Sequence, residues 1–559
     1  MDIQRKLTDL IKDAVDSVAE TTGIESLPEV ILDIPKDKKL ADLSTNVAMQ
    51  ICKAKKGMMP QDMAEQITDI AKSGLRKKGL DKIIDKIEAK PPGFINFHFS
   101  SAYLRDVVGD IKKEADKFGS SRAGKGKKAL IEFVSANPTG PLSVAHGRQA
   151  AIGDALANIL EFAGFKVRRE YYLNDEGNQI LLLGRSIHAR YCELVGEMQE
   201  FPKDGYRGAY IYDIAKKAIE IHGKSFIEPD EKTIEFFSNL GIDFIMETIK
   251  KDLAGFGVSF DSYFSQHKMT RAGKIEKALR GLEKDKLTYE KDGALWFEST
   301  KFGDDKDRVI RKSDKAYTYL APDIAYHKDK FQRGFDILID LLGPDHHGYI
   351  PRLKAAAEGM GESPESLSIL IIQLATISRD GVPIKMSTRE GEFITLREVI
   401  DEVGKDVARF FFLMRRRDSH LDFDLELAKK ESMENPVYYI QYAHARICGI
   451  LEHKEKEAKS LTGKLSDLEL LDKKEELQTL RILREFPSII EWSALNLEPH
   501  RLIQYLMELA SSFHVFYTKH RVVTDNKELT SARLMLVEAL KVVFSKSLAL
   551  LGVSCPEKM

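Results

Sequence analysis

Several polar clusters in this chain combine residue types and spacing that suit chemistry on phosphate. The first runs from Ser143 to Arg148 and contains His146 and Gly147, where a strand-like run and a polar loop give way to a helix-like pattern. A strand, a loop and a helix N-terminus together present backbone N–H groups and the positive end of a helix dipole, which bind phosphate. We expect the chemistry of the protein at this junction, although an ordinary strand–loop–helix with a capping histidine would show the same pattern.

A second polar cluster follows Ile384 and contains Lys385, Ser387 and Arg389 ahead of Gly391. A loop with glycine, cations and a hydroxyl is typical of a phosphate clamp, because cations stabilise the charge that develops on a transferred or departing phosphate. As an isolated string, the same residues could form a helix-capping turn.

The third cluster, from Tyr317 to His327, suits a cationic ligand. Tyr319 and Asp323 are four residues apart, so on a helical turn they would share one face. A carboxylate beside a phenol can receive a guanidinium, which needs acceptor oxygens in a fork and a flat partner. A helix start with a buried tyrosine explains the pattern equally well.

The fourth cluster could be interpreted as a metal site. It comprises Gly343, Asp345, His346 and His347, directly after the apolar run that ends at Leu342. Two adjacent histidines point in different directions, and no third ligand has suitable spacing. We therefore expect no metal site here.

The elements that must position these clusters are those of an α/β domain with a parallel sheet. The first strand is predicted from Ala129 to Val134, and apolar residues at helical spacing follow from Ile152 to Leu160. Further strand-like runs end at Tyr172 and Leu342, each followed by a polar loop. Strands that alternate with helices predict a parallel sheet, and ligands bind outside the carboxyl ends of its strands.

We expect three domains, since a chain of 559 residues exceeds the roughly 100–200 residues of one domain. Residues 1–115 mix helix-like patterns with short β-rich runs, which indicates an N-terminal α+β module. Residues 116–402 carry the parallel-sheet domain, with a helical insertion at about 191–264. Residues 403–559 are helical in pattern, which predicts an all-α bundle.

The composition is that of an ordinary globular protein. Hydrophobic residues make up 43% of the chain and charged residues 31%, and the net charge is -2, so any nucleic-acid surface must be local. We see no apolar run of about 18 residues and no signal-peptide pattern, so we expect no membrane partner. The four cysteines lie far apart, as free thiols of a cytoplasmic protein would.

Two of the clusters resemble the signatures of a known family. The run from Ser135 to Leu142, followed by His146 and Gly147, is similar to the signature region of arginyl-tRNA synthetases, a class I aminoacyl-tRNA synthetase family. The family usually carries His-x-Gly-His, whereas this chain has Ser143 and Ala145 in place of the first histidine and the glycine.

The second signature, Lys-Met-Ser-Lys-Ser, resembles the run from Lys385 to Arg389, with Thr388 at the second lysine. That lysine is usually credited with stabilising the pyrophosphate side of the transition state. Arg389, one residue further on, is a candidate to compensate. The helical region after Asn435 and the end of the chain also resemble the family, so the likeness covers essentially the whole sequence.

The resemblance implies a role for residues that match the family's functional positions. Those with a catalytic role are His146, Lys385 and Ser387. Those that bind ATP are Ser143, His146, Gly147, Gly343, Asp345, His346, Lys385, Met386, Ser387 and Arg389. Those that bind arginine are Glu132, Ser135, Asn137, Tyr319 and Asp323. Those that face tRNA are Phe94, Asn96, Tyr442 and Met559.

The implied activity is ATP-dependent activation of L-arginine to arginyl-adenylate, followed by transfer to the 3′ end of tRNA(Arg). Mg²⁺ would accompany ATP through phosphates and water, and a monomer is expected. Glu132 and Asp323 favour a cationic substrate over the substrate of a glutamate enzyme, and the zinc ligands of a cysteine enzyme are missing. An alternative is a catalytically weakened paralogue that binds tRNA or regulates, which Ser143, Ala145 and Thr388 would support.

Overall fold

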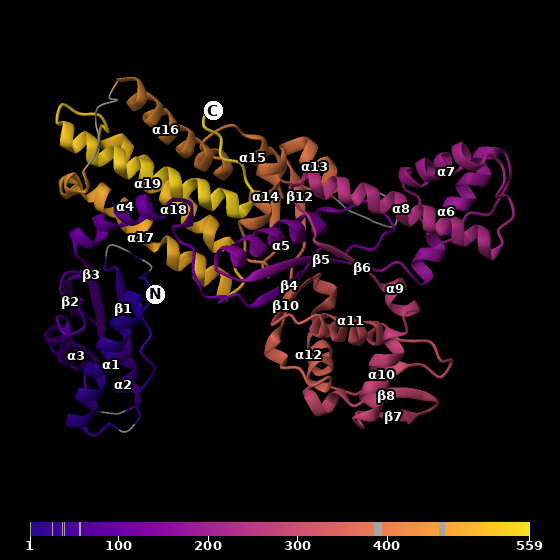
Figure 1. Ribbon diagram of the computed structural model, residues 1–559, viewed down its shortest axis with the longest axis horizontal. Coiled ribbons are helices and arrows are strands. Elements are labelled where there is room, and N and C mark those ends of the chain that lie inside the picture. The colour runs from indigo at the N-terminus through magenta and orange to yellow at the C-terminus, as the bar shows by residue number, and fades with distance from the viewer. Residues whose placement is uncertain are drawn as a thin grey trace.

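The structure is a computed structural model that describes residues 2–24, 26–35, 37, 40–54, 57–384, 394–457 and 464–559. Figure 1 shows an elongated molecule with a central sheet. The N-terminal module lies beneath the C-terminal helices at one end. A helical arm extends from the sheet at the other end.

The N-terminal module is an α+β unit with its own apolar core. Its antiparallel sheet has the strand order β1–β3–β2. The strands are β1 (Leu43–Thr45), β2 (Ile84–Lys90) and β3 (Phe94–Phe99). The helices are α1 (Asp2–Thr22), α2 (Val47–Ala54) and α3 (Pro60–Gly74), and α4 (Ser101–Glu114) leads out of the module.

Five parallel strands form the central sheet, in the order β11–β10–β4–β5–β6. They are β4 (Lys128–Glu132), β5 (Lys166–Leu173), β6 (Ser262–Ser265), β10 (Ile337–Leu342) and β11 (Leu367–Ile371). From β4 the chain adds strands on one side, and from β10 it adds a strand on the other. The order therefore reverses between β4 and β10, which is where sheets of this Rossmann type bind ligands. The predicted parallel sheet is confirmed.

Two helices flank this point of reversal, on opposite faces of the sheet (Figure 1). Helix α5 (Val144–Phe162) follows β4 and is buried along nearly its whole length. Its close approach to the preceding loop needs a glycine, because a Cβ at Gly153 would lie 2.3 Å from the ring of Phe133. Helix α11 (Leu320–Gln332) precedes β10, and the chain after β10 passes through a 3-10 turn (Pro344–Tyr349) into α12 (Ile350–Gly359).

Long helices separate β5 from β6 and form the arm in Figure 1. They are α6 (Asn178–Val195), α7 (Ala209–His222) and α8 (Glu231–Gly255). After β6 come α9 (Gln266–Arg271), α10 (Lys274–Lys284) and the small antiparallel sheet of β7 (Thr288–Lys291), β8 (Ala294–Phe297) and β9 (Arg308–Arg311).

The C-terminal region is mainly helical. Its helices are α13 (Leu396–Val403), α14 (Lys405–Leu413), α15 (Leu425–Lys429), α16 (Pro436–Glu457), α17 (Lys474–Leu495), α18 (His500–Lys519) and α19 (Lys527–Leu551). One strand, β14 (Leu421–Asp424), interrupts the expected helical run. It pairs in parallel with β12 (Ala375–Arg379), whose other neighbour is β13 (Val382–Pro383).

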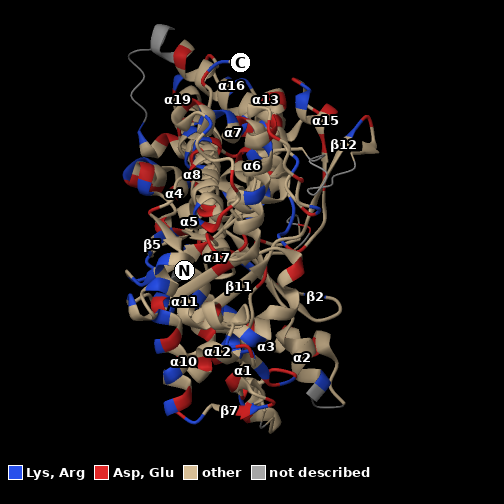
Figure 2. Ribbon diagram, turned by 90° about the vertical axis from the view of Figure 1, so that its right-hand side faces the viewer, with Lys and Arg blue, Asp and Glu red and all other residues tan. Residues whose placement is uncertain are grey.

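Basic and acidic residues are mixed over the fold (Figure 2). In Figure 2, basic and acidic residues are interspersed along the ribbon and do not separate into large areas of one sign. Among the described residues, no helix combines the length and apolar character needed to cross a membrane. All four cysteines are free thiols.

Candidate functional site

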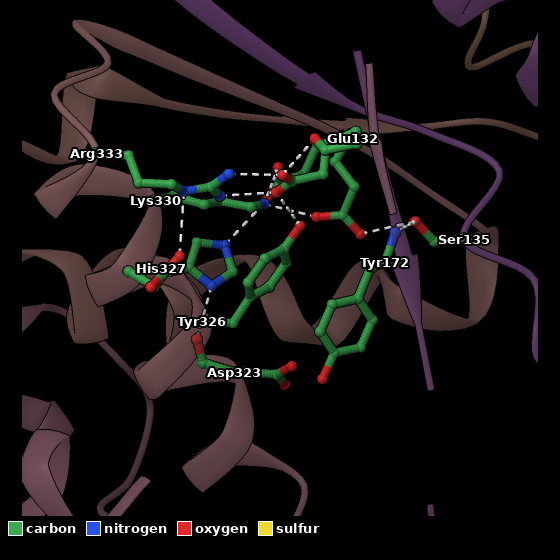
Figure 3. Close-up of polar contacts among 12 residues, drawn as sticks. Glu132, Ser135, Tyr172, Asp323, Tyr326, His327, Lys330 and Arg333 are labelled. Carbon is green, nitrogen blue, oxygen red and sulfur yellow. Dashed lines mark hydrogen bonds and ion pairs between the residues drawn. The ribbon is translucent and has the colours of Figure 1, made fainter. Parts of the chain in front are cut away.

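The third cluster lies beside the carboxyl end of β4 and the loop that follows that strand (Figure 3). Glu132 ends β4, and Asp323 lies in the first turns of α11. Figure 3 shows both residues around one polar network, together with Ser135 from the loop that follows β4.

The loop that leaves β4 is held in a strained conformation. Val134 and Ser135 have φ values of 68° and 38°, in the left-handed region that side chains rarely adopt. The Ser135 hydroxyl donates to Oε1 of Glu132 at 2.9 Å and accepts from the backbone N–H of Tyr172 at 3.0 Å. Strain of this kind persists only where surrounding contacts impose it, and it concentrates at functional sites.

Neighbouring elements hold the rest of this loop. The hydroxyl of Tyr171 donates to the backbone carbonyl of Ala136 at 2.7 Å. The side-chain amide of Asn137 donates to Oε1 of Gln179 at 2.9 Å, so Asn137 faces the start of α6. The loop is therefore fixed from β5 and from the helical arm.

His146 lies in the first turn of α5, as the sequence predicts for a residue at a helix N-terminus. Its Nδ1 accepts a hydrogen bond from the backbone N–H of Ser143 at 3.1 Å. Burial lowers the pKa of the His146 imidazole from the usual 6.5 to about 4. The ring is therefore neutral near pH 7, and because Nδ1 is the acceptor, Nε2 carries the hydrogen and can donate it.

The other residues of the first and fourth clusters differ in burial and in contacts. The Gly147 N–H donates within α5 to the Ser143 carbonyl, and a Cβ at Gly147 would lie 2.7 Å from Leu396, so this glycine serves the packing of α5. Gly343 begins the turn that carries Asp345 and His346. The side chains of Asp345 and His346 are exposed and lie 3.4 Å apart, between Oδ2 and Nε2.

The second cluster is only partly described. Lys385, Met386, Ser387 and Arg389 lie outside the described residues. The segment that follows them, at Thr395 and Leu396, lies beside the first cluster. Thr395 forms an isolated antiparallel bridge with Ser143, and the N–H of Leu396 donates to the carbonyl of Leu142 at 2.8 Å.

Asp323 is half-buried, and its carboxylate accepts no hydrogen bond from any described residue. Burial, with a smaller effect from Glu132, raises the pKa of this carboxyl from 3.8 to about 6. Tyr319, one turn earlier at the N-cap position of α11, is 81% exposed. The two residues thus share the helix start, as the spacing predicts, but the Asp323 side chain is half-buried and the Tyr319 ring is open to solvent.

The sequence analysis missed the partner of Glu132. Lys330, which is fully buried, donates to Oε2 of Glu132 at 2.6 Å and to Oδ1 of Asp340 at 2.7 Å. Glu132 is therefore a paired charge, which accounts for a carboxylate in a buried strand. The missed signal was the spacing of Asp323, His327 and Lys330 on α11, at i, i+4 and i+7 of one helix face.

A second group near Asp323 was also missed. The hydroxyl of Tyr172 donates to Oε1 of Gln266 at 2.6 Å, and the amide of Gln266 donates to Oε1 of Glu176 at 2.7 Å. Burial raises the pKa of the Tyr172 phenol, and the charges of Asp323 and Glu132 raise it further. The surroundings of Asp323 are therefore acidic and include a phenol, which suits a cation with several N–H donors.

The geometry thus joins two chemistries at one edge of the sheet. A neutral imidazole at a helix N-terminus can donate to an anionic oxygen. The acidic side chains around Asp323 can hold a cation. Within the ranges that the structure describes, no three His, Cys, Asp or Glu side chains are grouped as metal ligands.

The residues that match tRNA-facing positions lie far from this site. Phe94, at the start of β3, is 39% exposed, whereas Asn96 is buried and its Oδ1 accepts from the Ser44 hydroxyl at 2.7 Å. On α16, Tyr442 stacks on Tyr438 with ring centroids 6.0 Å apart. Met559 ends the chain and is 53% exposed.

Sequence models of known families cover almost the whole chain. The model described as "tRNA synthetases class I (R), catalytic domain" matches residues 108–430. The "Arginyl tRNA synthetase N terminal domain" model matches residues 5–99, and the "DALR anticodon binding domain" model matches residues 440–559.

Individual proteins are similar along the full length. The arginine–tRNA ligase of Syntrophotalea carbinolica is 46% identical over 562 residues, with 100% of each chain covered. That of Geobacter sp. (strain M21) is 48% identical over 536 residues, with 95% of each chain covered. The solved arginyl-tRNA synthetase of Thermus thermophilus superposes with a TM-score of 0.77, covering 99% of this chain and 100% of its own. At 21% identity, this last likeness shows the fold.

Proposed function

The chain belongs to the arginyl-tRNA synthetase family and is an arginine–tRNA ligase, and from this premise we infer that it activates arginine at the carboxyl ends of β4 and β10. The observation that carries this assignment is the Asp323 carboxylate, which is half-buried and has no hydrogen-bond donor among the described residues. A half-buried carboxylate with a raised pKa is stabilised by a cation that pairs with it.

In this proposal, the arginine side chain lies among the acidic side chains around Asp323. The Asp323 carboxylate pairs with the guanidinium, and the exposed ring of Tyr319 supplies the flat partner at the entrance. Glu132, Ser135 and Asn137 surround the α-amino and α-carboxyl end. A site built to accept several N–H donors discriminates against lysine, which brings a point charge without the planar fork, and against citrulline, which brings no charge.

ATP lies toward the N-terminus of α5. The Nε2–H of His146 donates to the phosphates, and the helix dipole of α5 stabilises their charge. The α-carboxylate of arginine attacks the α-phosphorus, pyrophosphate leaves, and arginyl-adenylate forms. Lys385 and Ser387 are assigned to the departing phosphates, with Met386 and Arg389 beside them. The Ser143–Thr395 bridge supports this assignment, because it brings the chain beyond them back to the first cluster.

Mg²⁺ is proposed to arrive with ATP. The described residues offer no cluster of metal ligands, which suits an ion held by phosphates and water and not by a protein cage. The ion would neutralise the charge of the phosphates while the chain's own residues orient them. The other residues assigned to binding of the nucleotide are Ser143, Gly343, Asp345 and His346. Gly147 acts through the packing of α5.

In the second step, a hydroxyl of the terminal ribose of tRNA(Arg) attacks the adenylate carbonyl and AMP leaves. Phe94 and Asn96 are assigned to one tRNA-contacting module (1–115), and Tyr442 and Met559 to a second (403–559). The catalytic domain (116–402, with the insertion at about 191–264) lies between them in the chain. We also propose that the protein is a monomer and acts in the cytoplasm.

Exchange of pyrophosphate into ATP, measured with arginine and tRNA(Arg), tests the assignment. Asp323→Asn is expected to raise the Michaelis constant for arginine by about 100-fold, with that for ATP unchanged, because charged hydrogen bonds are each worth about 1.5–3 kcal/mol. Gln332→Ala, at an exposed position of the same helix, is the control. An unchanged Michaelis constant for arginine in Asp323→Asn would remove Asp323 from the mechanism.

A further inference from the structure

Three carboxylates lie side by side across the centre of the sheet. Asp340 on β10 is the Cα partner of Glu132 on β4, and Glu132 is the partner of Glu170 on β5. Paired residues of parallel strands project to the same face, so all three carboxylates point the same way. Each is at most 6% exposed. Three buried like charges in a row are unfavourable unless cations face them.

Helix α11 supplies those cations. Arg333 donates to both oxygens of Glu170, at 2.6 and 2.7 Å, and Tyr326 donates to the same carboxylate at 2.8 Å. Nε2 of His327 lies 2.8 Å from Oδ2 of Asp340. Figure 3 shows these side chains projecting from the helix toward the row.

Among the described residues, Lys330 alone joins two members of the row. Its Nζ lies between Glu132 and Asp340, at 2.6 and 2.7 Å, and 4.2 Å from the ring centre of Tyr326. Burial alone would lower the pKa of Lys330, but Asp340 and Glu132 raise it above its usual value. Across the described chain, Lys330 is also the one cation in contact with Glu132.

Glu132 thus has one anchor on each oxygen. Ser135 donates to Oε1 and Lys330 donates to Oε2, which fixes the rotamer of this carboxylate. The Ser135 anchor belongs to the strained loop, and the Lys330 anchor belongs to the helix that carries Asp323. The two carboxylates assigned to arginine are therefore connected through α11.

We propose that Lys330 is the positioning residue of the arginine site, and that it holds Glu132 ionised and oriented toward the amino group of arginine. The proposal rests on the proposed function, because that function assigns Glu132 to arginine. Lys330 lies behind Glu132 and does not touch the substrate. Without it, Glu132 would face Asp340 with no cation between them, so one carboxyl would take up a proton.

The test compares Lys330→Met, which removes the charge, with Lys330→Arg, which keeps it. Lys328→Met, two residues earlier and not in contact with Glu132 or Asp340, is the matched control. Michaelis constants for arginine and ATP are measured by pyrophosphate exchange at pH 7 and 8.5, beside melting curves. Glu132→Gln reports separately on the assignment of Glu132 to arginine.

We expect Lys330→Met to raise the Michaelis constant for arginine about tenfold at pH 7, since a buried charged partner left unpaired costs at least one factor of ten in affinity. The turnover number and the Michaelis constant for ATP change less than threefold. The defect shrinks at pH 8.5, where the pair of carboxyls loses its extra proton. Lys330→Arg recovers most of the affinity.

Two results would overturn the proposal. The first is a folded Lys330→Met enzyme with the wild-type Michaelis constant for arginine while Glu132→Gln is impaired. The second is an impaired Lys330→Met enzyme whose defect is the same at both pH values and extends equally to ATP. If Lys330→Met does not fold, Lys330→Gln decides, since it keeps a hydrogen-bond donor and loses the charge: unchanged arginine affinity overturns the proposal, and a severalfold loss supports it. Wild-type affinity in both Glu132→Gln and Lys330→Met would instead remove Glu132 from the proposed function.

Discussion

The hydroxyl of Tyr210 donates to the backbone carbonyl of Thr139 at 2.6 Å. Tyr210 belongs to α7 in the helical arm, and Thr139 belongs to the loop that follows β4. Gly140, the next loop residue, packs closely enough that a Cβ there would lie 3.1 Å from the same hydroxyl. The arm therefore contacts the loop that carries the strained residues of the proposed arginine site.

The first prediction concerns this contact. Tyr210→Phe is expected to lower the rate of pyrophosphate exchange about fivefold, because one lost hydrogen bond is worth about 1 kcal/mol. Tyr212→Phe is the matched control, since its hydroxyl contacts Glu193 and not the loop. Equal exchange rates for the two variants would show that the arm does not position the loop.

The second prediction concerns pH. Burial raises the pKa of Asp323 to about 6 in the free enzyme, so the carboxyl is protonated below that pH and cannot pair with a guanidinium. The ratio kcat/KM for arginine should therefore fall about tenfold per pH unit below pH 6 and level off above it. Asp323→Asn should lower the ratio at every pH and lose this dependence. If the pH profile of Asp323→Asn kept the same break near pH 6, that break would belong to the titration of another group.

The third prediction concerns folding stability. Asp323→Asn should lower activity but raise the stability of the fold. A carboxyl whose folded pKa is raised from 3.8 to about 6 destabilises the fold as pH rises through that window, and the cost persists above it. Asp323→Asn removes the cost, so the ligand-free protein should gain about 1–2 kcal/mol at pH 7.5 and nothing at pH 3.5, with partial solvent exposure reducing the effect. Chemical denaturation at both pH values measures this. A loss of stability at pH 7.5 would mean that Asp323 serves the fold.

How far the sequence predicts this structure depends on the range of each contact. The strand from Lys128, the helix after it and the strand that ends at Leu342 follow from local apolar patterns, and the structure confirms them. The short strand β14 was missed, because it alternates with charged residues and is formed only by pairing with β12, about 45 residues earlier.

In the candidate site, too, local spacing predicts the position of some residues and not of others. The position of His146 at a helix start and of Asp323 in a helix follows from spacing. The pairing of Lys330 with Glu132 could not be predicted locally, because the two residues are 198 positions apart and a lysine on a helix is usually solvated. The left-handed conformation of Val134 has no sequence signal either, since it is imposed by contacts from β5 and the loop.

The fourth prediction concerns His146. A burial-lowered pKa of about 4 means that the ring acts as a neutral N–H donor to phosphate and not as a cation. His146→Ala should lower the turnover number for exchange about 100–1,000-fold, the usual loss for one preorganised donor. Lys385→Ala is expected in the same range. His146→Asn keeps a neutral donor and should lose less, and an equal loss in both His146 variants would indicate that charge is required.

The last prediction separates two neighbouring positions on β3. Phe94 is exposed, so Phe94→Ala should weaken tRNA(Arg) binding about tenfold, with unchanged thermal stability, because stacking of a base on an aromatic ring is worth about 1–3 kcal/mol. Asn96 is buried and accepts from Ser44, so Asn96→Ala should act on the module itself and lower its stability by about 1–3 kcal/mol. Fluorescence anisotropy with labelled tRNA at two salt concentrations, beside melting curves, measures both effects. Phe94→Leu, which keeps an apolar side chain without the ring, is the control for stacking. If Phe94→Ala bound tRNA as tightly as the wild type at both salt concentrations, this face of the N-terminal module would not contact tRNA.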